Sequence, residues 1–238
     1  MFGISRKTSP CDFPETTVRK ISNLNECCNF LSRASVELSK VQQETQQLLA
    51  SIGELQRVSQ ALPDNTKESI QAIECSQAVD RCAESCASLA QDIKAWTKSG
   101  GGEAISPRLR AVRQQIRLAA CSAEITSAKD ILSLAISVLK LHALQETNPA
   151  AYDEKNPIAL AMQHWIHEVS DKSRAACFGA EGLARELETQ YARALTRRAR
   201  GNPSTLANVA GSLEQAEKQK QAYVRVLRSC DAAMGAIG

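Results

Sequence analysis

Aromatic residues, proline and glycine are all scarce in this chain of 238 residues, which contains 4% aromatics, 7 prolines and 11 glycines. A β-sandwich or β-barrel needs aromatic and β-branched strands with frequent turns, so the composition argues against an all-β fold. A disordered chain is excluded as well, because 43% of the residues are hydrophobic and 23% are charged. The composition is that of a soluble globular protein, long enough to bury a core of its own.

Long apolar runs are missing too. The longest, residues 131–144, contains Lys140 and His142, and is too short and too interrupted to cross a bilayer. The N-terminal sequence MFGISRKTSPCDFPE lacks the apolar stretch of a signal peptide. The 9 cysteines are odd in number and lack the spacing of a secreted disulfide scaffold. We therefore expect a cytoplasmic protein in a reducing compartment, with free thiols and no transmembrane helix.

The prolines divide the chain into long segments with helical periodicity. Three of them follow a residue that favours the helix N-cap, in the pairs Ser106-Pro107, Asn156-Pro157 and Asn202-Pro203. Between the prolines, apolar residues recur at alternating spacings of three and four. The pattern predicts an all-α fold, an antiparallel bundle of five long helices at residues 15–61, 65–98, 107–146, 157–200 and 204–236. A flexible segment at 1–14 would precede a single elongated domain at 15–238.

Apolar stripes on these helices predict the core. The helix at 107–146 carries two stripes, which include Leu132 and Leu134, so its C-terminal half is apolar almost all round and we expect it to be central. Single stripes are expected to bury the residues that follow. They are Cys75, Val79, Cys82, Cys86, Leu89, Ile93 and Trp96 in the second helix, Ile158, Met162, Trp165 and Val169 in the fourth, and Ala216, Lys220, Tyr223, Leu227 and Cys230 in the fifth.

Two sets of residues suggest a thiol or metal centre. Cys82 and Cys86 lie one helical turn apart, and His164 and His167 are three residues apart on another helix. Because neither a CxxC pair nor an HExxH pattern is present, we interpret the cysteines as core residues and the histidines as surface residues. A thiol or metal protein that uses all four remains an alternative. The chain also lacks a GxSxG elbow and a glycine-rich phosphate loop, so no catalytic residue, cofactor or enzymatic activity is predicted.

Two arginine stripes are the candidate binding residues. Each stripe occupies one face of a helix, since its members recur at three- and four-residue spacings. They consist of Arg110, Arg113 and Arg117 in the third helix, and Arg193, Arg197 and Arg200 in the fourth. Such stripes contact anionic lipid head groups or an acidic partner helix, or they are solvated faces paired with neighbouring acids. Nucleic acid is not expected, because the net charge is only +3 and the stripes lack stacking aromatics.

A family resemblance covers about residues 20–145. The segments ECSQAVDRCAESCASLAQDIKAW and SPRLRAVRQQIRLAACSAEITSAKDILSLAISVLKLHAL resemble the N-terminal helical domains of fungal STAND receptors, the HeLo-like group. In that family, a helix with a small-residue seam and a terminal aromatic precedes a polar loop, a basic helix and a leucine-rich tail. The corresponding residues here are Trp96, Arg110, Arg113, Arg117, Lys129, Leu132, Leu134 and Leu139.

The resemblance implies a helical signalling or cell-death effector domain that associates with like domains. The family usually opens with an apolar helix, whereas this N-terminus is polar and contains proline, which argues against membrane permeabilisation. We therefore predict a non-enzymatic protein-interaction or signalling bundle with a protein partner or self-association. The alternative is a peripheral membrane effector that binds anionic lipid through the arginine stripes.

Overall fold

The structure is a computed structural model that describes residues 11, 13–31, 36–62, 70–98, 107–147, 157–196 and 203–237. This part of the chain contains helices and no strand, so the predicted all-α class is confirmed. The elements are α1 (Glu15–Leu31), α2 (Val36–Gln60), the 3-10 helix η1 (Gln71–Ile73), α4 (Cys75–Lys98), α5 (Pro107–Thr147), α6 (Pro157–Thr196) and α7 (Pro203–Ile237). Of the segment at 1–14, residues 11, 13 and 14 are described, and Cys11 and Phe13 are buried.

The single helix predicted at 15–61 is wrong, because the structure has two helices there. α1 ends at Leu31, α2 begins at Val36, and the two helices pack against each other. The apolar stripe concealed this break, because Leu31 and Leu38 are seven residues apart and the stripe stays in phase across it. The start signal was Ser35, which immediately precedes Val36 and belongs to a residue type that favours the N-cap.

The helix predicted at 65–98 also begins later than expected. η1 precedes α4, and Glu74 between them has a φ of 46°, in the left-handed region. A continuous right-handed helix cannot pass through that conformation, so α4 starts at Cys75. Residues 63–69 lie outside the described part. The three later helices begin and end close to their predicted bounds, and residues 197–200 of the predicted fourth helix lie outside the described residues.

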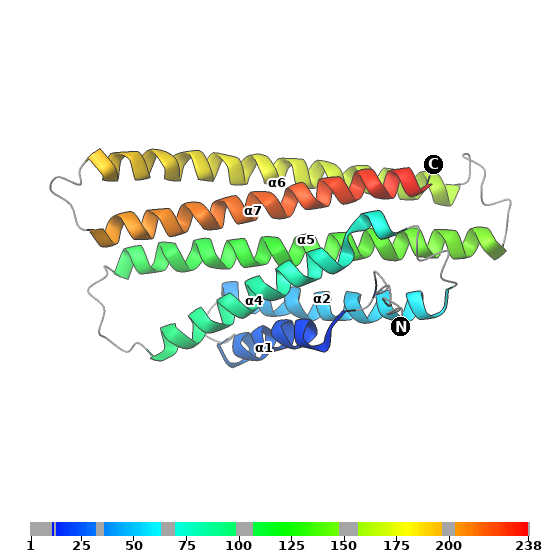
Figure 1. Ribbon diagram of the computed structural model, residues 1–238, viewed down its shortest axis with the longest axis horizontal. Helices are drawn as coiled ribbons and strands as arrows, with labels where there is room; N and C mark the ends of the chain where they lie inside the picture. Colours follow the sequence, from blue (N-terminus) through cyan, green and yellow to red (C-terminus); the bar gives the residue numbers. More distant parts are fainter. Residues whose placement is uncertain are drawn as a thin grey trace, which may run out of the picture.

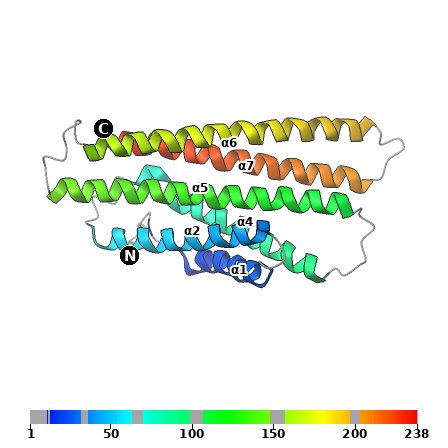
Figure 2. The same cartoon turned by 180° about the vertical axis from the view of Figure 1, so that it is seen from behind.

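α5 is the centre of the molecule, as its two apolar stripes predicted. It packs against α2, α4 and α7, and Leu132, Leu134 and Leu139 are fully buried. Figures 1 and 2 show α5 between α2 and α4 on one side and α7 with α6 on the other. Successive helices from α5 to α7 run in alternating directions. α6 packs mainly against α7 and forms one edge of the molecule.

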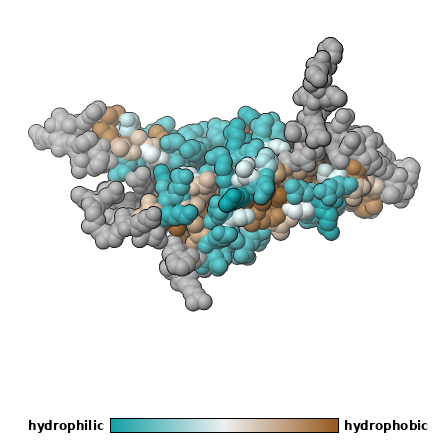
Figure 3. All heavy atoms as spheres, turned by 60° about the horizontal axis from the view of Figure 1, so that its bottom comes forward, coloured by the Kyte–Doolittle hydropathy of each residue, from teal (hydrophilic) through white to brown (hydrophobic). Residues whose placement is uncertain are grey.

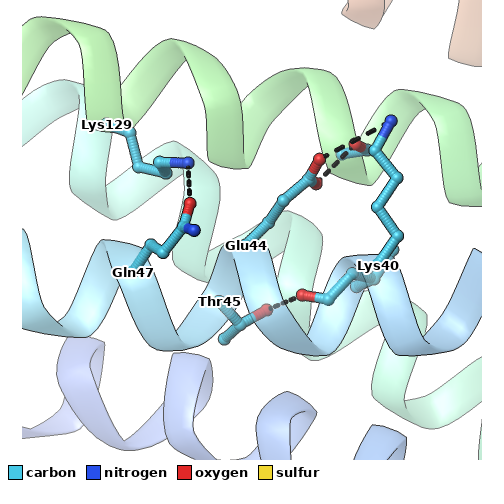
Figure 4. A network of polar contacts seen from close by, with 7 residues as sticks. Lys40, Glu44, Thr45, Gln47 and Lys129 are labelled. Atoms are coloured by element: carbon cyan, nitrogen blue, oxygen red, sulfur yellow. Dashed lines mark hydrogen bonds and ion pairs between the residues drawn. The ribbon is translucent and has the colours of Figure 1, made fainter. Parts of the chain in front are cut away.

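Polar side chains of α2 make contacts within the helix and with α5. The hydroxyl of the buried Thr45 donates to the Val41 carbonyl at 2.6 Å, which is the helical back-bond that lets a threonine enter a core. On the side facing α5, Glu44 accepts a hydrogen bond from Ser122 at 2.6 Å, and Lys129 donates to Gln47. Figure 4 shows how these side chains link α2 to α5.

The stripes predicted for α6 and α7 are only partly correct. Ile158 is 51% exposed, whereas Ile166, eight residues further along α6, is deeply buried. On α7, Tyr223 and Leu227 are only half-buried, whereas Val226 is fully buried. The reason is that α7 packs against both α5 and α6, so its buried residues lie on two sides rather than along one seam.

The molecular surface shows no long apolar band in the view of Figure 3. Hydrophilic side chains cover most of that face, with smaller apolar areas between them. Among the described residues, no helix combines the length and the apolar character needed to cross a membrane.

Candidate functional site

A groove of about 510 Å³ lies between α4 and α7, above the surface of α5. It exists because both helices pack against α5 and α4 crosses α5 obliquely, as Figure 1 shows. We call it the α4–α5–α7 groove. Its charged side chains are Arg81, Glu84 and Asp92 from α4, Arg117 and Glu124 from α5, and Glu214, Glu217, Lys218 and Arg225 from α7.

A buried ion pair forms part of the groove floor. The Arg225 guanidinium donates from Nη2 to the Glu124 carboxylate, and the two side chains are only 9% and 10% exposed. The Arg225 Nε is buried and has no hydrogen-bond partner in the structure. Close by, the Ser127 hydroxyl donates to the Ala222 carbonyl at 2.8 Å and provides a second polar tie between α5 and α7. Removing one member would leave a buried charge unpaired, so the pair disfavours any placement of α7 on α5 that separates the two side chains.

The outer part of the groove has more accessible charges. Arg117 forms an ion pair with Asp92, which bridges α5 and α4, and the two side chains are about a quarter exposed. On α7, Lys218 lies 2.7 Å from Glu214, and both are well exposed. Exchange of the exposed Lys218–Glu214 pair for charges of another molecule costs little, since exposed pairs contribute about 0–1 kcal/mol each, whereas the Arg117–Asp92 pair is more enclosed.

The predicted core cysteines lie directly behind the groove floor. Cys82 and Cys86 are buried with their sulfur atoms 3.9 Å apart, and Cys121 contributes to the lining of the groove. A hydrogen bond with Cys86 and burial raise the pKa of Cys121 well above its usual value. Burial likewise raises the pKa of Cys28 to about 12. These thiols are therefore protonated packing groups, as the seam interpretation predicted, and poor nucleophiles.

The structure does not bring the four candidate thiol and metal residues together. Cys82 and Cys86 are buried in α4, whereas His164 and His167 are exposed on α6. His164 instead lies 3.7 Å from the Glu168 carboxylate on its own helix. Within the described ranges, no group of three or more histidines, cysteines or acids is arranged to hold a metal ion. Cys82 and Cys86 therefore do not form one centre with His164 and His167 in this structure.

The arginine stripes meet different environments. Arg117 lies in the groove and is paired with Asp92, so it does not face solvent as part of a free basic surface. Arg110 and Arg113 belong to α5, but their side chains are outside the described part of the chain. Arg193 is exposed on α6. Arg197 and Arg200 lie outside the described residues.

Sequence reasoning missed Glu124 and Arg225, the two buried charges of the site. A usable signal was present around Arg225. The small residues Ala222, Ser229 and Ala233 form a seam in which position 225 occupies the face turned to α5. A charge inside a seam of small residues predicts a buried partner of opposite sign, and Glu124 is flanked by the small residues of the segment AACSAEITSA in α5.

Comparison with known proteins gives no match, whether to a protein-family model, a curated protein or a solved structure. The function is therefore inferred from the groove residues themselves.

Proposed function

We propose that this protein is a non-enzymatic interaction module that docks a helical segment of a partner protein in the α4–α5–α7 groove. The observation that carries the proposal is the lining, which has four basic and five acidic side chains over a narrow floor that includes Leu89 and Ala120. Charged side chains of both signs beside an apolar floor suit an amphipathic helix that carries charges of its own.

The groove has the length of a short helix. Its lining on α4 runs from Arg81 to Asp92, which corresponds to about 17 Å or three helical turns. When a partner helix with charges of both signs binds, Arg117, Asp92, Glu214 and Lys218 exchange their present partners for charges of that helix. Electrostatic complementarity of this kind sets specificity and association rate more than affinity. We therefore expect a moderate affinity that falls with added salt.

The resemblance to HeLo-like domains supports a signalling role, since those domains work by association. The alternative use of the first arginine stripe on anionic lipid is less favoured, because Arg117 lines the groove between α4 and α7 and does not lie on a face open to a flat bilayer. We expect the module to act in a reducing compartment, where its buried thiols stay free.

The test compares partner capture by two matched charge-reversal variants. The groove variant carries Arg117→Glu and Lys218→Glu. The control variant carries Arg19→Glu and Arg57→Glu, two exposed positions outside the groove lining. Both changes alter the net charge equally. Each protein is crosslinked to its partners in extracts of the native cell, and recovered proteins are quantified by mass spectrometry.

We expect the wild type and the control variant to capture the same partner protein. The groove variant should capture at least tenfold less of it. Capture that is equal for all three proteins would refute it. Loss in the groove variant counts only if its thermal midpoint, measured by circular dichroism, is close to that of the control. If both variants lose capture equally, the interaction follows net charge and the groove is not the docking site.

A further inference from the structure

One face of α6 is left open by the rest of the chain. α6 packs mainly against α7, and its opposite face lies at the edge of the molecule in Figures 1 and 2. Phe178 stands on that face near the middle of the helix and is 73% exposed. Ala175 and Gly182 lie beside it on the helix surface, as do the charged Arg174 and Glu181, and Gly179 follows it in the chain. A side chain built on either glycine would meet no atom within 4 Å.

Charges of opposite sign are placed symmetrically about Phe178. Asp171 lies seven residues before it and Arg185 seven residues after it. Seven residues are close to two full turns, so all three side chains share one face of the helix. Asp171 and Arg185 are 75% and 76% exposed. Each of them contacts a charge of its own helix, Asp171 with Arg174 at 3.3 Å and Arg185 with Glu181 at 3.8 Å.

We infer that this face binds the same face of a second copy of the chain, with the two α6 helices antiparallel and a twofold axis at Phe178. In that arrangement, Asp171 of each copy lies opposite Arg185 of the other, so the attraction occurs twice. The two Phe178 rings meet at the axis, and the neighbouring small residues let the helices approach closely. A parallel arrangement would place like charges together, which is why the charge pattern selects the antiparallel one.

The interaction is independent of the proposed groove. α4 and α5 take no part in it, and its members belong to α6 alone. A single pair of helices buries less surface than a standard stable interface. The dimer is therefore weak and forms only at high micromolar protein concentrations or where the protein is locally concentrated. The second copy is favoured over another occupant because the face is complementary to itself.

The test uses charge reversal followed by charge exchange. Asp171→Arg alone, or Arg185→Asp alone, turns both attractive pairs into repulsive ones, and the dimer dissociation constant should rise by at least about tenfold. The double variant Asp171→Arg with Arg185→Asp exchanges the charges and should return the constant to within about threefold of the wild type. Phe178→Ser should also weaken the dimer, and the charge exchange should not rescue this variant. Sedimentation equilibrium over a wide range of concentration measures each constant.

Matched controls separate association from folding. Glu26→Arg reverses an exposed charge on α1 and should leave the dissociation constant unchanged. The far-ultraviolet circular dichroism of every variant should match that of the wild type. The groove variant Arg117→Glu with Lys218→Glu should still dimerise, so failure of the groove proposal and of this one are distinguishable. A wild type that is monomeric throughout, or a double variant that is as weak as either single variant, would overturn the inference.

Discussion

Replacing Asp130 with asparagine should stabilise the protein at neutral pH, because this carboxylate is held where its charge is poorly solvated. Asp130 lies on α5, and burial raises its pKa from 3.8 to about 6, although Lys129 and Lys172 oppose the shift. Lys129 belongs to its own helix and Lys172 to α6. Asp130 also lies near two residues of α7, Tyr223 and Cys230. Burial is the main cause that raises the pKa values of these two residues, and the nearby charge of Asp130 raises them further.

The expected magnitude follows from the change in pKa. A rise from 3.8 to about 6 is about two units, and each unit corresponds to 1.36 kcal/mol, so the charged carboxylate costs at most about 3 kcal/mol of folding free energy. The folded state binds the proton more tightly than the unfolded chain. The cost is therefore fully present above pH 6, is relieved as the pH falls between about 6 and 4, and is absent below both pKa values.

Urea denaturation of the wild type and Asp130→Asn at pH 7.5, 6 and 4 measures this cost. The variant should be more stable by up to about 3 kcal/mol at pH 7.5, and the difference should shrink as the pH falls to 4. Asp231→Asn removes an exposed carboxylate on α7 and serves as the control, with no change expected at any pH. An Asp130→Asn variant that is less stable at pH 7.5, or a difference that does not vary with pH, would refute the reasoning.

Three further predictions concern the core and the groove floor. Arg225→Met should destabilise the protein by about 3–5 kcal/mol in urea denaturation. Adding Glu124→Leu to this variant should recover most of the lost stability. Equal losses in the single and double variants would contradict a coupled buried pair. In the native protein at pH 8, a thiol reagent followed by mass spectrometry should modify Cys27 and Cys177 first, and prompt labelling of the buried thiols would contradict the packing described. Leu139→Ala should cost about 3–5 kcal/mol, since this side chain is fully buried in the central helix, and a loss below 1 kcal/mol would contradict that position.

The helices whose bounds sequence reasoning placed correctly are those that begin at a proline. Pro107, Pro157 and Pro203 each begin a helix in the structure, because proline fits the first turn of a helix. The two apolar stripes around Leu134 in the sequence likewise predicted that this helix is central. These signals depend on residues close together in the sequence, so they do not require knowledge of the tertiary contacts.

The errors arise where the pattern of apolar residues carries no information about chain direction. The stripe through Leu31 and Leu38 stays in phase whether the helix continues or turns back, so spacing alone could not separate α1 from α2. The left-handed Glu74 is a second example, since glutamate carries no preference for that conformation and only tertiary packing selects it. The residues around Arg225 signal a buried charge, but not the groove itself, because Glu124 and Arg225 are far apart in the sequence and meet only through the packing of α7 on α5.

The groove follows from the geometry of the helices that cover α5. α5 has 41 residues and α4 has 24, so they extend about 62 Å and 36 Å respectively. α7, with 35 residues, runs nearly along α5, whereas α4 crosses it obliquely, and the two covering helices therefore diverge. The side chains along the divergence are reached by water, which explains why they are charged although they lie over a buried helix. A partner helix with complementary charges would lie over the part of α5 that α4 and α7 leave uncovered.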